Sequence, residues 1–240
     1  LGQIDHLAIA DLNFKDAELL ASQLGSHAKG IEVDINNTKN LLSILFDYDI
    51  VLNTVGPFFK FGYQVLKTSL EANCHYMDIC DDWEPTEKML ELNDIAKEKN
   101  LLALLGLGAS PGITNLLGRI AIDHLDIAHT IYTGWNLEEA QPEPISSQKE
   151  TNAAMIHGIE QITGKVKVLK DGKFEMVNPL EEIKVSYPNI GTYSAFIFDH
   201  PEANTFPYHF KDLLNSINLA HGNKSTIFVL KIMRKLINLK

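Results

Sequence analysis

The sequence predicts an α/β protein in which a doubly wound parallel sheet is followed by a second α/β domain with a mixed or antiparallel sheet. Apolar, strand-like runs alternate with helix-like segments over short links from residue 6 to about residue 120, an alternation typical of parallel α/β sheets. Beyond about residue 125, strand-like runs follow one another directly, as in antiparallel or mixed sheets. We therefore expect one domain over residues 1–108 and a second over residues 109–240.

The first half of the chain supplies the alternating elements in order. The expected strands cover 6–11, 31–35, 49–55, 75–79 and 101–105. The expected helices begin at Asn13 or Asp16, at Thr38, after Gly62, near Pro85 and at Ser110-Pro111, where cap residues, glycine or proline suit a helix start. In the last of these helices, Leu116, Leu117 and Ile120 share one face, and we expect them to point inward.

The second half is predicted to be richer in strands. The expected strands cover 128–135, 165–169, 173–177, 182–187 and 192–198, with Asp171-Gly172 as the turn of a hairpin. A polar loop is expected at 138–147, a helix over about 150–162 and another helix over 227–240. One face of the last helix carries Lys231, Arg234, Lys235 and Asn238. A membrane-surface role would explain this basic stripe, but the solvated face of a packed helix explains it more simply.

The composition excludes several classes of protein. The 240 residues carry a formal net charge of −10 with a pI near 5.3, which argues against nucleic acid as the main partner because phosphate binding needs clustered positive charge. No run of about 18 apolar residues exists, so we expect no membrane span. Cys74 and Cys80 are too few for a disulfide framework, which favours a reduced, cytoplasmic location.

Three of the expected strands end in unusual polar or glycine-rich segments. They read Asn-Thr-Val-Gly-Pro-Phe-Phe (53–59), Asp-Ile-Cys-Asp-Asp-Trp-Glu-Pro (78–85) and Gly-Leu-Gly-Ala-Ser-Pro-Gly-Ile-Thr-Asn (106–115). Ligands of open parallel sheets bind just beyond the carboxyl ends of the strands. If these three strands are neighbours, their exits face one crevice, and we expect the chemistry there. Each exit taken alone could equally be an ordinary turn or helix cap.

Asp11 is a candidate for binding a dinucleotide. It ends the first expected strand, where such folds accept hydrogen bonds from ribose hydroxyls, although an acid there is more often only a helix cap. Leu12 rather than arginine follows it, which favours NAD over NADP, whereas Lys15 weakens that preference. The phosphate loop G-x-G-x-x-G is absent and would lie about twenty residues before Asp11. We therefore expect an N-terminally truncated chain whose sheet lacks its first strand.

Four carboxylates gather after the fourth expected strand, at Asp78, Asp81, Asp82 and Glu84. Neighbouring like charges raise one another's pKa values, which suits proton transfer. Acidic residues also complement the dipole at a helix N-terminus, which is a purely structural explanation. We expect no metal site, because His and Cys at metal-ligand spacing are lacking. Cys80 is interpreted as a small apolar group that lines a pocket rather than as a reactive thiol.

Together, the three exits resemble the saccharopine dehydrogenase (glutamate-forming) family, which includes lysine 6-dehydrogenases and carboxynorspermidine dehydrogenases. The Asp11 strand and the stretches Gly172-Lys-Phe-Glu and Asp199-His-Pro-Glu fit the same pattern, and the resemblance covers roughly residues 5–207. It implies an N-terminal Rossmann domain and a C-terminal α/β domain for substrate binding and dimerisation. The implied reaction is hydride exchange between NAD or NADP and an amino-acid or polyamine-type carbon bonded to nitrogen, through an imine.

The resemblance also implies site residues. Its cofactor contacts fall on Ala10, Asp11, Asp34, Ile35, Val55, Gly56, Ile79, Cys80, Ala109, Ser110 and Pro111. Its substrate contacts fall near Cys80, Asp81 and Ser110. Asp81 and Asp78 are the expected groups for proton handling or for holding a substrate ammonium, with His200 as the second choice.

Two readings of the function follow from these residues. The first is an NAD(P)-dependent oxidoreductase of amino-acid metabolism, such as that of lysine, with an amino-acid or polyamine substrate and a second copy of the chain as partners. The alternative is a non-catalytic dinucleotide-binding or dimerisation module of the same fold. The alternative predicts cofactor binding without hydride transfer.

Overall fold

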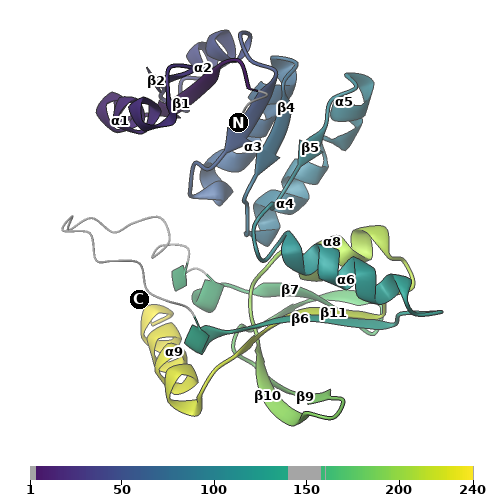
Figure 1. Ribbon diagram of the computed structural model, residues 1–240. Helices are drawn as coiled ribbons and strands as arrows, with labels where there is room; N and C mark the ends of the chain where they lie inside the picture. The colour runs from purple at the N-terminus through teal and green to yellow at the C-terminus, as the bar shows by residue number, and fades with distance from the viewer. Residues whose placement is uncertain (1–3, 140–157, 160, 240) are drawn as a thin grey trace.

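The computed structural model describes residues 4–139, 158–159 and 161–239, and within them the protein is α/β (Figure 1). The strands of the first half are β1 (Leu7–Asp11), β2 (Ala28–Glu32), β3 (Ile50–Asn53), β4 (His75–Asp78) and β5 (Ala103–Leu104). The helices are α1 (Phe14–Leu24), α2 (Thr38–Leu45), α3 (Phe58–Glu71), α4 (Trp83–Leu90), α5 (Asn93–Glu98) and α6 (Ile113–Asp123). Every strand pair in this half is parallel, so the predicted alternation is confirmed.

The parallel strands form two hydrogen-bonded groups rather than one continuous sheet. β1 pairs with β2, and β3, β4 and β5 pair in that order in a second sheet. One apolar cluster joins the two groups, since Val33 and Leu41 from the first pack with Phe58 and Leu66 from the second. The predicted doubly wound sheet is thus present in two parallel parts that share a core.

The second half forms a six-stranded mixed sheet. Its strands are β6 (Thr130–Asn136), β7 (Val166–Lys170), β8 (Lys173–Val177), β9 (Glu182–Tyr187), β10 (Gly191–Ile197) and β11 (Asn215–His221), and its helices are α8 (Glu202–His209) and α9 (Lys224–Ile237). β11 pairs in parallel with β6 along its whole length. It also pairs antiparallel with β7 at Ser216 and with β10 at Leu219 and Ala220. The prediction of a mixed or antiparallel sheet is therefore confirmed.

The hairpin of β7 and β8 turns where the sequence predicts. Asp171 and Gly172 both have positive φ, at 46° and 75°, as a two-residue type I′ turn requires. The central strand β11, by contrast, was not expected from the sequence. The loop predicted at 138–147 and the helix predicted over 150–162 lie largely outside the described residues.

Several helix starts differ from the prediction. Asn37 rather than Thr38 caps α2, because the Asn37 side chain accepts a hydrogen bond from the backbone N–H of Asn40 at 3.2 Å. α3 begins at Phe58, ahead of Gly62. The helix predicted near Pro85 begins at Trp83 and breaks after Leu90, which separates α4 from α5.

The start and the buried face of α6 were both predicted wrongly. Gly112, with φ of 117°, precedes the helix, so that Ser110 and Pro111 lie in the turn before it. Leu116, Leu117 and Ile120 are 66%, 61% and 56% exposed instead of buried. Gly118 faces α8, and a Cβ added there would meet the buried ring of Phe206. The small residue lets the two helices approach closely, so it decides which face is covered.

The basic face of α9 is solvated as expected, since Lys231, Lys235 and Asn238 are exposed and Arg234 is half-buried. Lys231, Arg234 and Lys235 line a cavity of about 550 Å³ against residues 178–181, and Arg234 Nη2 donates to Asn178 Oδ1 at 2.8 Å. An apolar stripe on the same helix is exposed as well. It consists of Phe228, Val229, Ile232, Met233 and Leu236.

The helices α6 and α8 lie between the mixed sheet and the first half of the chain (Figure 1). The first half packs around one buried cluster that contains Leu66, Leu70 and Tyr76. The mixed sheet packs around a different cluster, with Val168, Ile197 and Leu219 at its centre. The exits of β4 and β5 therefore face a boundary between two separately packed cores.

Candidate functional site at the strand exits

One chain of hydrogen bonds ties the exits of β3 and β4 together. The backbone N–H of Val55 donates to Asn53 Oδ1 at 3.0 Å. The Asn53 amide then donates to the Tyr76 hydroxyl at 2.9 Å, and this hydroxyl donates to Asp78 Oδ2 at 2.9 Å. Because the three side chains are buried, water does not compete for these bonds, and they hold the two exits in a fixed relation.

Asp78 extends the same network to the exit of β5. Its Oδ1 accepts from the backbone N–H of Cys80 at 3.1 Å and from that of Gly106 at 2.7 Å. The network therefore converges on one carboxylate from three strand exits. Backbone N–H groups can only donate, so the N–H groups of Cys80 and Gly106 need an acceptor. Asp78 Oδ1 is that acceptor.

Burial also sets the protonation of this network. Desolvation raises the pKa of Asp78 above its ordinary value, against the opposing effect of the Gly106 and Cys80 N–H groups and the Tyr76 hydroxyl. Burial likewise raises the pKa of Cys80, with the nearby Asp78 carboxylate as the second cause. The Cys80 thiol is fully buried and therefore lacks the thiolate character that a nucleophile needs.

The turn from β5 to α6 carries Ala109, Ser110 and Pro111 toward the second half. Gly106 begins it with φ of 69°, and a Cβ there would lie 2.5 Å from Pro111 Cγ, so glycine is required. The turn closes with the backbone N–H of Ile113, which donates to the carbonyl of Gly108 at 3.0 Å. Ser110 is half-buried at its outer bend.

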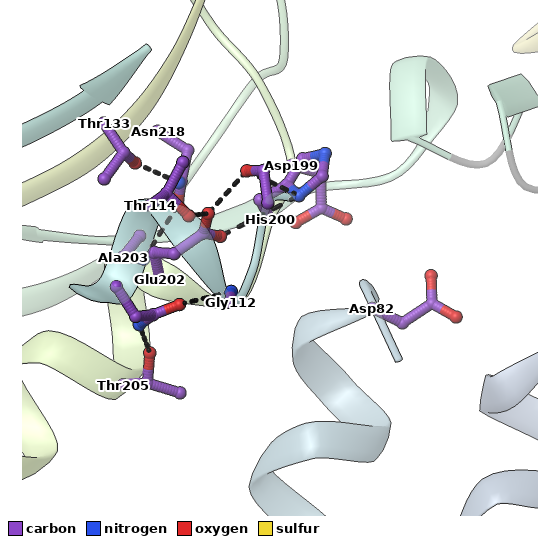
Figure 2. A network of polar contacts seen from close by, with 12 residues as sticks. Asp82, Gly112, Thr114, Thr133, Asp199, His200, Glu202, Ala203, Thr205 and Asn218 are labelled. Atoms are coloured by element: carbon purple, nitrogen blue, oxygen red, sulfur yellow. Dashed lines mark hydrogen bonds and ion pairs between the residues drawn. The ribbon is translucent and has the colours of Figure 1, made fainter. Parts of the chain in front are cut away.

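Glu202 connects this turn to the mixed sheet (Figure 2). It is the first residue of α8 and is 0% exposed. Its Oε1 accepts from the hydroxyls of Ser110 at 2.5 Å and Thr114 at 2.7 Å. The backbone of α8 is fixed in turn by β11, since Asn218 Oδ1 accepts from the N–H of Ala203 at 2.7 Å. The predicted site residue Ser110 is thus held by a residue that the sequence analysis did not single out.

His200 lies beside Glu202 (Figure 2). Its Nδ1 is 3.4 Å from Ser110 Oγ and 3.8 Å from Glu202 Oε2, and its Nε2 is 3.5 Å from the amide nitrogen of Gln161. The Trp135 ring packs edge-on against the imidazole with ring centroids 5.6 Å apart. His200 therefore lies next to the turn that follows β5 and is buried there.

A cavity of about 270 Å³ lies where the exits of β3 and β4 meet the second half. Asp82 from the first half of the chain and Asp199 from the second both line it. The aromatic side chains of Phe59 and Trp83 and the amide of Gln161 complete part of its wall. Among the residues that the structure describes, the acidic residues of its wall outnumber the one basic residue, Lys165. Acidic and aromatic groups on a partly enclosed surface suit a ligand that carries a positively charged nitrogen.

The two halves also meet through an ion pair next to this cavity. Lys167 Nζ of β7 lies 2.6 Å and 2.9 Å from the two carboxylate oxygens of Glu87 on α4. The same ammonium lies 5.6 Å from the Trp83 ring centroid and 4.7 Å from that of Phe174. These contacts fix Trp83 at the boundary between the halves.

The predicted cofactor contacts all lie at or just beyond strand ends. Ala10 and Asp11 are exposed at the end of β1, and Asp11 Oδ1 accepts from the N–H of Asn13 at 2.8 Å. Asp34 and Ile35 follow β2, where the Gln64 amide of α3 donates to the Ile35 carbonyl at 2.6 Å. The structure therefore joins the exit of β2 to α3, the helix that follows β3.

Residues after β3 and β4 differ in accessibility. Val55 and Gly56 are half-buried, and Ile79 is exposed beside the buried Cys80. Asp81 is half-buried and follows the network, whereas Asp78 is 0% exposed and forms its centre. Of the two expected carboxylates, Asp81 is thus the one that solvent and ligands can reach.

Reasoning from the sequence missed the roles of Tyr76, Thr114, Gln161 and Glu202. Thr114 and Glu202 lie in the singled-out stretches 106–115 and Asp199-His-Pro-Glu, and Tyr76 lies in the expected strand 75–79, whereas Gln161 belongs to no such motif. Among the described residues, no group of three or more His, Cys, Asp or Glu side chains could hold a metal ion. In the same part of the chain, no helix is long and apolar enough to cross a membrane.

Comparison with known proteins identifies relatives of this arrangement. Residues 2–104 match the family described as saccharopine dehydrogenase NADP-binding domain, which confirms the predicted resemblance and supports NAD or NADP as the cofactor. Carboxyaminopropylagmatine dehydrogenase from Synechocystis sp. is 24% identical over 207 residues, which cover 82% of this chain and 50% of that protein.

A solved structure extends the comparison to the fold. Saccharopine dehydrogenase (L-Glu forming) from Saccharomyces cerevisiae matches with a TM-score of 0.64 at 18% identity, over 98% of this chain and 53% of that one. The match confirms the predicted Rossmann-type fold class. The chain spans about half the length of these two relatives.

Proposed function

We propose that the chain forms the cofactor-binding and substrate-facing part of an NAD(P)-dependent oxidoreductase that acts on a carbon bonded to nitrogen. The observation that carries this proposal is the convergence of three strand exits on Asp78, next to a cavity with acidic and aromatic walls. Ligands of parallel α/β sheets bind at this position. Two relatives are by name dehydrogenases, of carboxyaminopropylagmatine and of saccharopine, which supports the proposal.

The residues present fit a nicotinamide dinucleotide. Asp11 is an exposed carboxylate at the end of β1, suited to ribose hydroxyls, and Val55-Gly56 form a half-buried turn at the end of β3. When bound, the cofactor supplies or accepts the hydride. We propose that Val55 and Gly56 border the nicotinamide and that the turn at Ala109, Ser110 and Pro111 supports it from the second half.

Among the expected catalytic residues, Asp81 is proposed to handle the proton or hold a substrate ammonium, because it is only half-buried and directly precedes Asp82, which lines the cavity. Asp78 is proposed to position other groups without touching the substrate. It is buried and accepts three hydrogen bonds, which suits a residue that holds the exits of β3, β4 and β5 in place. His200 is proposed to contribute through Ser110, which its Nδ1 approaches. Phe59 and Trp83 would exclude water from the reacting atoms.

The division of labour between the two halves is part of the proposal. We assign residues 1–108 to a dinucleotide-binding domain and residues 109–240 to a substrate-binding and dimerisation domain. The separate buried clusters of the two halves support this division. An exposed apolar stripe on α9 supports a homodimer, because a surface stripe of large apolar residues is typical of a protein interface. Two free thiols, Cys74 and Cys80, support a reducing, cytoplasmic location.

The test uses the complete gene product. Binding of NADH and NADPH is measured by the change in nucleotide fluorescence, and turnover is followed at 340 nm with lysine, saccharopine and carboxynorspermidine. Binding with turnover of at least one of these substrates is expected. Binding without turnover of any amine would support the non-catalytic alternative, and absence of both would overturn the proposal.

A further inference from the structure

Glu202 sets the direction of the hydrogen bonds that two neighbouring hydroxyls make. One of its oxygens, Oε1, accepts the hydroxyls of both Ser110 and Thr114. A carboxylate oxygen can only accept hydrogen bonds, so each hydroxyl donates its single proton to Glu202. The Ser110 oxygen is then left with lone pairs alone, and it can only accept hydrogen bonds from any further partner.

The second oxygen of Glu202 faces His200. Oε2 is buried, accepts no hydrogen bond from the residues that the structure describes, and lies 3.8 Å from His200 Nδ1. Ser110 Oγ, which has no proton to give, lies 3.4 Å from the same nitrogen. These two neighbours of Nδ1 are acceptors, which favours a proton on Nδ1.

The other side of the ring favours the same tautomer. His200 Nε2 lies 3.5 Å from the Gln161 amide nitrogen. This amide is oriented by the carbonyl of Asp199, to which its nitrogen donates at 3.2 Å. A donor next to Nε2 requires a lone pair there. The surroundings of His200 therefore place its proton on Nδ1 from both sides.

We propose that Glu202 is a positioning residue that fixes Ser110 as a hydrogen-bond acceptor at the cofactor site and holds the proton of His200 on Nδ1. This inference rests on the proposed function, which places Ser110 beside the nicotinamide. An acceptor at this point recognises an N–H donor, and the carboxamide of the nicotinamide is the group of that kind that the cofactor offers. Glu202 acts through Ser110 and does not itself touch the cofactor.

The first experiment measures the His200 tautomer by two-bond ¹H–¹⁵N correlation NMR on the complete gene product, with the signal assigned by the His200→Asn variant. Glu202→Gln keeps the shape of the side chain and an oxygen for Ser110 and Thr114, but it places an N–H donor opposite Nδ1. We expect the Nδ1–H tautomer in the parent protein and the Nε2–H tautomer in Glu202→Gln. Thr205→Val is the matched control, because it removes only the 3.3 Å contact with Asn115 between the same two helices.

The tautomer proposal is overturned if the parent shows Nε2–H or if Glu202→Gln leaves the tautomer unchanged. A merely structural role of Glu202 would alter stability without moving the proton between the ring nitrogens. The spectrum does not require a bound cofactor, so it judges this part of the inference even where the proposed function fails.

The second experiment measures NADPH and NADH affinity. We expect Ser110→Ala and Glu202→Ala each to raise the Kd about tenfold, equivalent to the loss of about 1.4 kcal/mol, and the double variant to raise it no further because both act through one hydroxyl. Glu202→Gln, which retains an acceptor for Ser110, should bind within about twofold of the parent, as should Thr205→Val.

The outcomes separate the two proposals. A parent protein that binds neither nucleotide overturns the proposed function, and with it the role of Ser110 as an acceptor for the cofactor. A parent that binds, together with a Glu202→Ala variant that binds equally well, overturns only the positioning role. If Glu202→Ala does not fold, the comparison of Ser110→Ala with Glu202→Gln still tests the positioning role. Nucleotide binding that is weakened in Glu202→Gln as much as in Ser110→Ala would contradict the inference.

Discussion

The backbone N–H of Gly106 donates to Oδ1 of Asp78 at 2.7 Å, which joins the exits of two neighbouring parallel strands by one buried bond. The same carboxylate receives the Tyr76 hydroxyl through its other oxygen. The exits of β3, β4 and β5 are therefore not independent turns that share an edge. They form one unit, and a change at its centre is expected to reach all three.

Replacement of Tyr76 by Phe removes the hydroxyl between Asn53 and Asp78 while it keeps the buried ring. The Asn53 amide and Asp78 Oδ2 would each lose a buried partner, and we expect the free energy of unfolding to fall by about 1–3 kcal/mol. Urea denaturation followed by circular dichroism measures the change. Tyr132→Phe, on an exposed ring, is the control and should stay within about 0.5 kcal/mol of the parent. Equal stability of the two variants would contradict the network.

The protonation of Asp78 gives a prediction with a defined sign. Burial raises its pKa in the folded protein, so its contribution to stability is fully present below the ordinary pKa of 3.8 and is lost as pH rises through the raised value. Asp78→Asn does not titrate. The stability advantage of the parent over Asp78→Asn should therefore be largest near pH 3 and shrink as the pH rises. Denaturation at a series of pH values measures it, and an advantage that grows with pH would show that the N–H donors outweigh burial.

Gly118 tests the close approach of α6 and α8. In most helix interiors, Gly→Ala stabilises by about 0.5–1 kcal/mol. Here the new Cβ would meet the Phe206 ring and lie 3.0 Å from Ile131 Cδ1, and Phe206 is itself buried. We expect Gly118→Ala to destabilise by about 1–3 kcal/mol through overpacking. Gly158→Ala is the control, because none of the residues that the structure describes lies within 4 Å of a Cβ there. If both variants gain stability in thermal denaturation, the packing at Gly118 is wrong.

The sequence predicts the parts of this protein that depend on local pattern. Alternation of apolar residues and short links was enough for β1 to β5, and Asp171-Gly172 was enough for the hairpin of β7 and β8. Burial of helix faces was less predictable. Leu116 and Leu117 have the spacing of a core stripe, but the partner of α6 lies on the other side, at Phe206, and no local signal reports a partner some ninety residues away.

The candidate site divides in the same way. Residues at the ends of strands, such as Asp78 and Ser110, were found because glycine, proline and acids gather there. Glu202 and Gln161 were missed, because their roles depend on contacts across the fold, 92 residues along the chain from Ser110 and 39 residues along it from His200. Asp78 was expected to handle a proton or hold a substrate ammonium, but it accepts hydrogen bonds from three donors within the protein. Two of these donors belong to Tyr76 and Gly106, and no spacing in the sequence predicts that they lie beside Asp78.

The exposed apolar stripe on α9 is the surface through which the proposed homodimer is expected to form. Ile232 and Leu236 are 43% and 60% exposed one helical turn apart, and five large apolar side chains gathered on one helix are more than scattered surface residues usually amount to. Ile232→Asp with Leu236→Asp would place two charges within such an interface. We expect the double variant to shift the protein from dimer to monomer in sedimentation velocity runs, with the secondary structure retained.

Leu19→Asp is the matched control for this prediction, because Leu19 is 61% exposed on α1, outside the stripe, and its substitution should leave the dimer intact. A parent protein that is monomeric at every concentration would contradict the homodimer. If neither the double variant nor Leu19→Asp changes the dimer, the copies associate through another surface. Burial of two unpaired carboxylates in the interface would cost far more free energy than the contacts of one helix contribute to binding.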